Sequence, residues 1–112
     1  MPKDVARWAQ GRAVVGRRHL WTVRSALDVP PDRRPNGWLL KFPWYTRPFG
    51  LPRIDGRRLD GAGTFHASVN RADDQSGTWV ASTLEFSDAG CWEVAARFFD
   101  TKAMRFRIRV GS

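Results

Sequence analysis

The chain has 112 residues, 42% of them hydrophobic and 27% charged, with a formal net charge of +8 at pH 7. This length suits one domain that buries a core without help from a metal or a disulfide, and the single cysteine excludes an internal disulfide. No apolar run approaches the ~20 residues that cross a bilayer, so no membrane span is predicted.

Residues 1–19 differ in composition from the rest, and we expect a basic N-terminal arm or a short helix there. Val5 and Trp8 follow helical spacing, and Asp4 can cap a first turn. Such an arm can bind a membrane surface, a partner or nucleic acid; the alternative is a loosely docked terminus. Residues 20–112 are assigned to the domain proper.

The domain contains segments in which apolar and polar residues alternate, a pattern that predicts strands. In chain order these segments are residues 20–27, 38–42, 64–70, 78–86, 91–98 and 104–110. A further strand is expected over 53–59, where the turn dipeptide Asp55-Gly56 would introduce a kink or bulge. Clusters of Gly, Pro, Asp and Asn separate them and indicate turns and loops. About seven strands without a strong internal helix predict an all-β fold, an antiparallel sandwich.

Residues 43–53 are predicted to form an aromatic and basic loop, because Pro43 should end regular pairing or mark a sheet edge. Trp44, Tyr45 and Phe49 lie in this segment. On a loop at the end of a sandwich they would form a contact patch for a protein or a sugar. Alternatively they fold back and fill the open end of the core, since a small chain with six tryptophans must bury most of them.

The last two strands are predicted to form a hairpin closed by residues 100–102. A three-residue loop places both apolar sets on one face, with Phe98 opposite Met104. The outer face then carries Arg97, Arg105, Arg107 and Arg109. In this register Glu93 lies opposite Arg109, which is favourable, and Arg97 lies opposite Arg105, which is not.

The corner before this hairpin resembles a known family. Asp88-x-Gly90-x-Trp92-x-Val94 is similar to the Asp-x-Gly-x-Tyr-x-Cys corner before the sixth strand of immunoglobulin domains. Trp92 stands at the tyrosine position and Val94 at the cysteine position, so we expect neither the corner hydrogen bond nor the inter-sheet disulfide.

A second resemblance covers roughly residues 37–110. Gly90-Cys91-Trp92-Glu93-Val94, with Gly56-Arg57-Arg58-Leu59-Asp60 upstream, resembles a group of uncharacterised bacterial surface or secreted proteins. The two resemblances imply an immunoglobulin-like sandwich located outside the bacterial cytoplasm. The N-terminus has no apolar stretch of the secretory type, which by itself favours the cytoplasm.

The sequence offers little support for catalysis, and no enzyme, metal or cofactor is predicted. His19 and His66 are the only histidines, and neither His-x-x-x-His nor paired-Cys spacing occurs. Cys91 lies on the outer face of its strand, where we expect a half-buried bystander, and nothing in the sequence brings it to His66.

Two binding functions are therefore weighed. The first is a non-catalytic interaction module of an extracytoplasmic bacterial protein, which binds another protein or a surface polymer. The alternative is a basic domain that grips nucleic acid or another polyanion through the outer arginines of the hairpin. The excess of arginine over lysine also follows from GC-rich coding, which lowers the weight of the charge.

Overall fold

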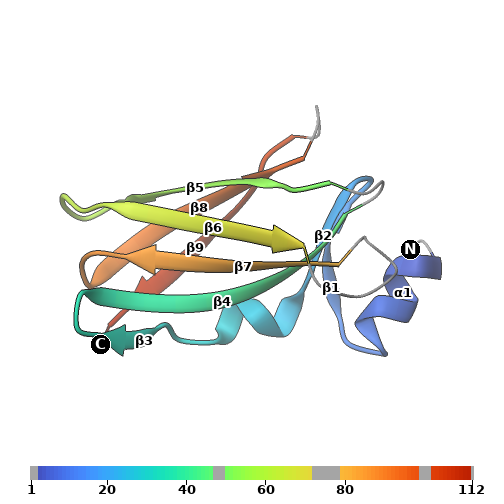
Figure 1. Ribbon diagram of the computed structural model, residues 1–112, viewed down its shortest axis with the longest axis horizontal. Coiled ribbons are helices and arrows are strands. Elements are labelled where there is room, and N and C mark those ends of the chain that lie inside the picture. The colour runs from blue at the N-terminus through green and yellow to red at the C-terminus, as the bar shows by residue number, and fades with distance from the viewer. Residues whose placement is uncertain (1–2, 47–49, 72–78, 99–101, 112) are drawn as a thin grey trace.

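The computed structural model describes residues 3–46, 50–71, 79–98 and 102–111, and the statements below refer to these ranges (Figure 1). They form one α-helix, α1 (Lys3–Ala9), one 3-10 helix, η1 (Arg24–Asp28), and nine strands. The strands are β1 (Val14–Arg17), β2 (Leu20–Val23), β3 (Asp32–Arg34), β4 (Gly37–Thr46), β5 (Arg53–Arg58), β6 (Phe65–Arg71), β7 (Trp79–Phe86), β8 (Gly90–Arg97) and β9 (Met104–Val110). Every strand pairing is antiparallel. The prediction of an all-β, antiparallel fold is confirmed.

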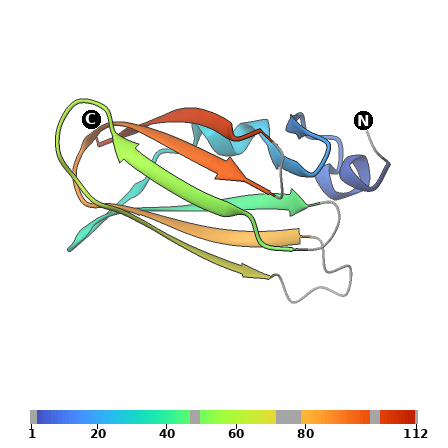
Figure 2. The ribbon, with the colours of Figure 1, turned by 90° about the horizontal axis from the view of Figure 1, so that it is seen from above.

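The strands form two sheets that pack face to face. The larger sheet has the order β1-β2-β4-β7-β6, with β3 paired to β4, and the smaller has the order β5-β8-β9. Figure 2 shows them as two layers. The short strands β1 and β3 were not predicted, and the predicted strand 20–27 ends at Val23, where η1 takes over.

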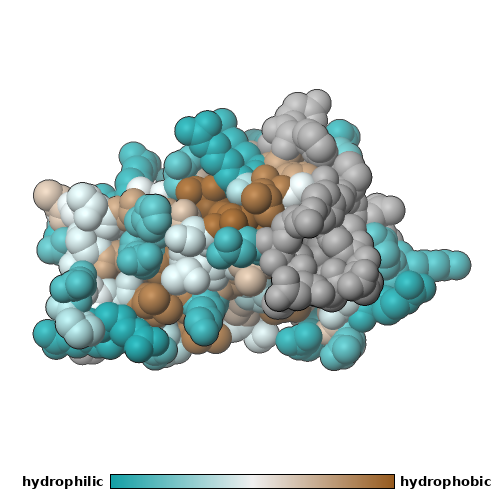
Figure 3. Space-filling view, viewed as in Figure 1, coloured by the Kyte–Doolittle hydropathy of each residue, from teal (hydrophilic) through white to brown (hydrophobic). Residues whose placement is uncertain are grey.

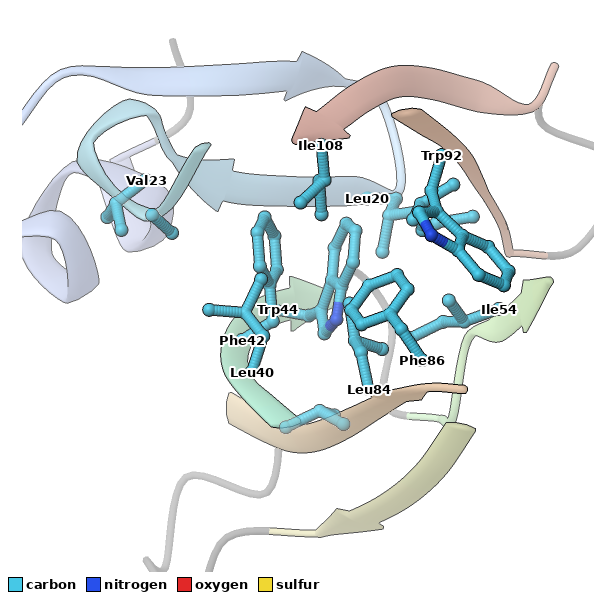
Figure 4. Close-up of a cluster of buried hydrophobic side chains, with 14 of the residues drawn as sticks. Leu20, Val23, Leu40, Phe42, Trp44, Ile54, Leu84, Phe86, Trp92 and Ile108 are labelled. Carbon is cyan, nitrogen blue, oxygen red and sulfur yellow. The ribbon is translucent and has the colours of Figure 1, made fainter. Parts of the chain in front are cut away.

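The two sheets enclose an aromatic core. Phe42 and Trp44 point from β4 toward Ile108 of β9 (Figure 4). The ring of Phe42 stacks on Phe106 at a centroid distance of 5.2 Å. The strands β7, β8 and β9 contribute every second residue, because successive side chains of a strand point to opposite faces. The same alternation leaves the other side chains of β5, β8 and β9 on the outer surface.

The corner between β7 and β8 contains a hydrogen bond, although the sequence predicted none there. The indole N–H of Trp92 donates to the carbonyl oxygen of Asp88 at 3.0 Å. Trp92 is fully buried, and so is Val94. Gly90 has φ +142°, and a Cβ there would lie 2.6 Å from Oδ1 of Asp60, so this position requires glycine. The indole N–H thus links the start of β8 to the turn before it.

The predicted register of the last hairpin is wrong by two residues. The structure pairs Ala96, not Phe98, with Met104, and places Glu93 opposite Arg107. Phe98 lies beyond the last pair, where it is buried and packs closely against Gly50. Because this ring is buried outside the ladder, the connection between β8 and β9 is longer than the three residues predicted. The shift is even, so the predicted core and outer faces are retained.

The prediction that regular pairing ends at Pro43 is also wrong, because β4 continues to Thr46. Pro43 pairs with Ala81 of β7. Its carbonyl oxygen accepts a hydrogen bond from the hydroxyl of Thr22 at 2.6 Å. A proline is accommodated here because β2 pairs with β4 only at Tyr45 and Thr46, and β3 only at the other end of β4.

The N-terminal segment is packed onto the domain. Val5 and Ala9 of α1 are buried, and Trp8 packs against Tyr45 at a ring-centroid distance of 5.3 Å. β1 then pairs with β2 as the outermost strand of the larger sheet. The predicted boundary at residue 19 therefore falls inside a hairpin. No helix in the described ranges is long and apolar enough to cross a membrane.

Candidate functional site

The outer surface of the smaller sheet is rich in arginine. We call it the arginine face and define it by the outward side chains of β5, β8 and β9. These are Arg53, Asp55, Arg57, Cys91, Glu93, Ala95, Arg97, Arg105, Arg107 and Arg109. Six arginines and two carboxylates leave an excess of four positive charges. Part of this face was predicted, and the structure adds Arg53 and Arg57 of β5.

The register arranges the arginine face in rows across the three strands. Arg97 pairs with Arg53, whereas Arg105 lies opposite Ala95, so the predicted pair of Arg97 and Arg105 does not form. The two edge strands lie about 10 Å apart, and successive outward residues of one strand lie about 7 Å apart. The central strand carries the short side chains of Ala95 and Cys91, which are half-buried. The strip between the two edge strands thus carries short side chains at Cys91 and Ala95 and long ones at Glu93 and Arg97.

Only part of the positive charge is neutralised within the face. Oε1 of Glu93 lies 3.4 Å from Nε of Arg57 and 3.3 Å from Nη1 of Arg105. Asp55 lies 3.7 Å from Arg53. The arginine side chains of these pairs are 53–82% exposed, and exposed ion pairs contribute only about 0–1 kcal/mol.

The three remaining arginines of the face, Arg97, Arg107 and Arg109, are exposed and make no ion pair within the described ranges. Their guanidinium groups are therefore available to an anion from outside the chain. Each can donate two parallel hydrogen bonds to a phosphate or a carboxylate.

A carboxylate at one end of the face fastens β5 to β8. The backbone N–H of Cys91 donates to both oxygens of Asp60 at 3.2 Å, and Nε of Arg58 donates to Oδ1 at 3.1 Å. The hydrogen bond from Cys91 is the main cause that lowers the pKa of Asp60 below its ordinary value of 3.8. Desolvation opposes this shift, and the charge of Arg58 adds to it.

This geometry predicts a pH-dependent contribution of Asp60 to stability. Because its pKa is lower in the folded protein than in the unfolded chain, ionised Asp60 stabilises the fold above pH 3.8, and the stabilisation is lost as the pH falls through the folded value. We expect Asp60→Asn to lower the free energy of unfolding at pH 7 and to match the wild type well below pH 3.8, as measured by urea unfolding. A difference that does not change with pH would contradict this role.

The predicted aromatic patch is not formed by Trp44 and Tyr45. Trp44 is fully buried, and its indole N–H donates to Oγ of Ser82 at 3.0 Å. Tyr45 is 7% exposed, and its hydroxyl donates to Oδ2 of Asp4 at 3.2 Å. Both residues belong to β4. Their burial agrees with the alternative prediction, in which the aromatic residues fill the core. Phe49 lies outside the described residues.

The structure keeps Cys91 and His66 apart. Cys91 lies on the smaller sheet opposite Arg109, whereas His66 lies on β6 of the larger sheet opposite Glu85. Within the described ranges, no group of three or more His, Cys, Asp or Glu side chains has the geometry to hold a metal ion. Cys91 and His66 therefore do not form a thiolate pair.

A cleft of about 320 Å³ lies where β4 and β6 begin and β7 ends. The sequence did not indicate it. It is lined by Arg34, Pro35, Asn36, Gly37, Trp38, Leu39, Thr64, Phe65, His66, Glu85, Phe86 and Ser87. Residues 34–37 lie between two predicted strands, but their position beside β6 depends on the tertiary fold. Positive and negative groups both line this cleft, so its charge does not select a ligand.

The larger sheet presents a different surface from the arginine face. Its outer side is mostly hydrophilic or neutral, and hydrophobic residues gather near the gap between β5 and β6 (Figure 3). The side chains of β6 that turn toward the core, Phe65, Ala67 and Val69, are half-buried. They pack as the rim of the core at the open edge of the sandwich.

Comparisons with protein-family models, curated proteins and solved structures give no match for this chain.

Proposed function

We propose that the chain is a non-catalytic interaction module with an immunoglobulin-like sandwich fold. The orders β2-β4-β7-β6 and β5-β8-β9 correspond to the ABED and CFG sheets of constant-type immunoglobulin domains. The corner hydrogen bond from Trp92 to Asp88 supports the same assignment, because it lies where the tyrosine corner of that fold lies. The bacterial, extracytoplasmic location stays a prediction that rests on the resemblance.

We propose further that the arginine face binds the phosphate backbone of duplex nucleic acid. The observation that carries this proposal is the row of exposed arginines on β9, of which Arg107 and Arg109 have no ion pair in the described ranges. A planar guanidinium matches the paired oxygens of a phosphate, which makes arginine well suited to nucleic-acid backbones. Three outward residues on one strand span about 14 Å, enough to meet several phosphates.

The composition of the arginine face favours a duplex over a single strand. Proteins that bind single strands combine positive charge with exposed aromatic rings on which bases stack. The arginine face has no aromatic side chain, and the rings of Trp92 and Phe106 lie on its inner side. Contacts to the backbone alone carry no sequence information, so the proposed binding is independent of sequence.

A salt titration with a charge-reversal variant tests this proposal. We expect the wild type to bind a short duplex DNA with a Kd of roughly 10⁻⁴–10⁻⁶ M near physiological salt, and log K to fall with log salt by about 0.9 per phosphate contact. Arg107→Glu combined with Arg109→Glu should raise Kd at least roughly tenfold and reduce the slope by about 2. Fluorescence anisotropy between about 50 and 200 mM salt measures both quantities.

The matched control is Arg24→Glu combined with Lys41→Glu, which changes the net charge equally. Both residues are exposed and lie in η1 and β4, away from the arginine face. The control should bind almost like the wild type. Equal losses in both double variants, or binding of polyglutamate in preference to DNA, would contradict duplex binding by this face.

A further inference from the structure

A carboxylate occupies the middle of the arginine face. The side chain of Glu93 is 19% exposed. One of its two carboxylate oxygens, Oε1, contacts guanidinium groups from both edge strands, Arg57 of β5 and Arg105 of β9. Glu93 thus bridges the two rows of arginines across the central strand.

The register shows that this bridge is selective. Glu93 lies directly opposite Arg57 and Arg107. It nevertheless contacts Arg105, which leans toward it from a position opposite the short side chain of Ala95. Arg107 makes no ion pair in the described ranges. Two arginines therefore converge on one point above the strip, and a third lies beside it.

We infer that Glu93 occupies an oxyanion subsite, which a backbone phosphate takes over when the arginine face binds a duplex. This inference rests on the proposed function and assigns the centre of the same face. The group that the subsite accepts is a phosphate with two free oxygens, which can receive a pair of hydrogen bonds from each guanidinium.

The contacts of Glu93 are weak enough to be exchanged. They measure 3.3 and 3.4 Å, longer than the ~2.7–2.9 Å of strong hydrogen bonds between a charged donor and a carboxylate. Both guanidinium groups belong to side chains more than half exposed, so an anion from solution can reach them. An incoming phosphate therefore gains two arginines while only a loose contact is broken.

Glu93 consequently limits the affinity of the face for polyanions. As long as its carboxylate stays in the subsite, it competes with the phosphate for the same two arginines. It also places a negative charge beside the ligand, which lowers affinity by repulsion. A residue with this position acts as a built-in competitor.

Two isosteric variants test this inference, because Glu93→Gln and Asp55→Asn each remove one negative charge from the arginine face. Asp55 is 69% exposed, and Arg53, at 3.7 Å, is its one ion-pair partner in the described part of the chain, so its removal reports the general effect of charge. For binding to the same duplex DNA, we expect Glu93→Gln to lower Kd roughly tenfold and to steepen the salt slope by about 1–2, as two more arginines engage phosphate. Asp55→Asn should lower Kd by no more than about threefold.

The outcomes separate this inference from the proposed function. If the wild type binds no duplex, the proposed function fails. If the wild type binds and both variants lower Kd equally, the face binds DNA but Glu93 holds no subsite. A higher Kd for Glu93→Gln would show that Glu93 positions the arginines and would overturn the inference. Melting curves verify that each variant is folded.

Discussion

Replacing Trp92 with alanine is expected to lower the free energy of unfolding by about 3–5 kcal/mol, as for other large aromatic residues removed from a core. The side chain is fully buried, and its ring meets Phe86 edge-on at a centroid distance of 5.3 Å. Alanine would leave a cavity between the two sheets and would remove the hydrogen bond to Asp88. Urea unfolding followed by circular dichroism measures the loss.

Trp92→Phe separates the packing of Trp92 from its hydrogen bond. Phenylalanine keeps an aromatic ring in the core but cannot donate to the carbonyl oxygen of Asp88, so we expect a smaller loss of about 1–2 kcal/mol. A change below about 0.5 kcal/mol for Trp92→Ala, the range typical of surface substitutions, would contradict its place in the core.

Trp44→Ala is the second substitution with a large expected effect, again about 3–5 kcal/mol. Trp44 is fully buried, and its indole donates to Oγ of Ser82, which in turn donates to the carbonyl oxygen of Phe42 at 2.7 Å. The substitution therefore opens a cavity and leaves Ser82 with one partner fewer. Thermal and urea unfolding measure the effect.

The same variant also distinguishes a core residue from a contact residue. As long as the Trp44→Ala protein is folded, we expect it to bind duplex DNA with a Kd within about twofold of the wild type, because Trp44 is fully buried in the core and contributes no side chain to the arginine face. Loss of binding without loss of stability would place the interaction surface at Trp44 and not on the arginine face. Ser82→Ala removes only the hydroxyl that accepts the hydrogen bond from Trp44. We expect it to lower the free energy of unfolding less than Trp44→Ala does.

The faces of the strands followed from the sequence because the alternation of side chains is a local property. The segment from Trp92 to Phe98 and that from Met104 to Val110 alternate regularly, so their core and outer sides needed no knowledge of the partner strand. The outer arginines of β9 were found in this way. The contribution of β5 was not, because Asp55-Gly56 has the composition of a turn yet lies inside β5.

The register and the extent of β4 depended on contacts distant in sequence. Phe98 leaves the ladder to pack against Gly50, which moves every pair of the hairpin by two residues. Pro43 remains in β4 at a point where neither β2 nor β3 pairs with it, and the hydroxyl of Thr22, 21 residues earlier, donates to its carbonyl oxygen. The bridge from Glu93 to Arg57 and Arg105 likewise joins three strands. None of these contacts has a local signature in the sequence.

The most direct measurement of the central claim is a titration of the isotopically labelled protein with duplex DNA, followed by the backbone amide signals in NMR. We expect the largest shifts in the ranges 53–58, 90–97 and 104–110, which form the sheet under the arginine face. The signals of α1 and of β6 should change little. Shifts concentrated around the cleft of Trp38 and Glu85, or no shifts at DNA concentrations above the Kd of the anisotropy assay, would contradict polyanion binding by this face.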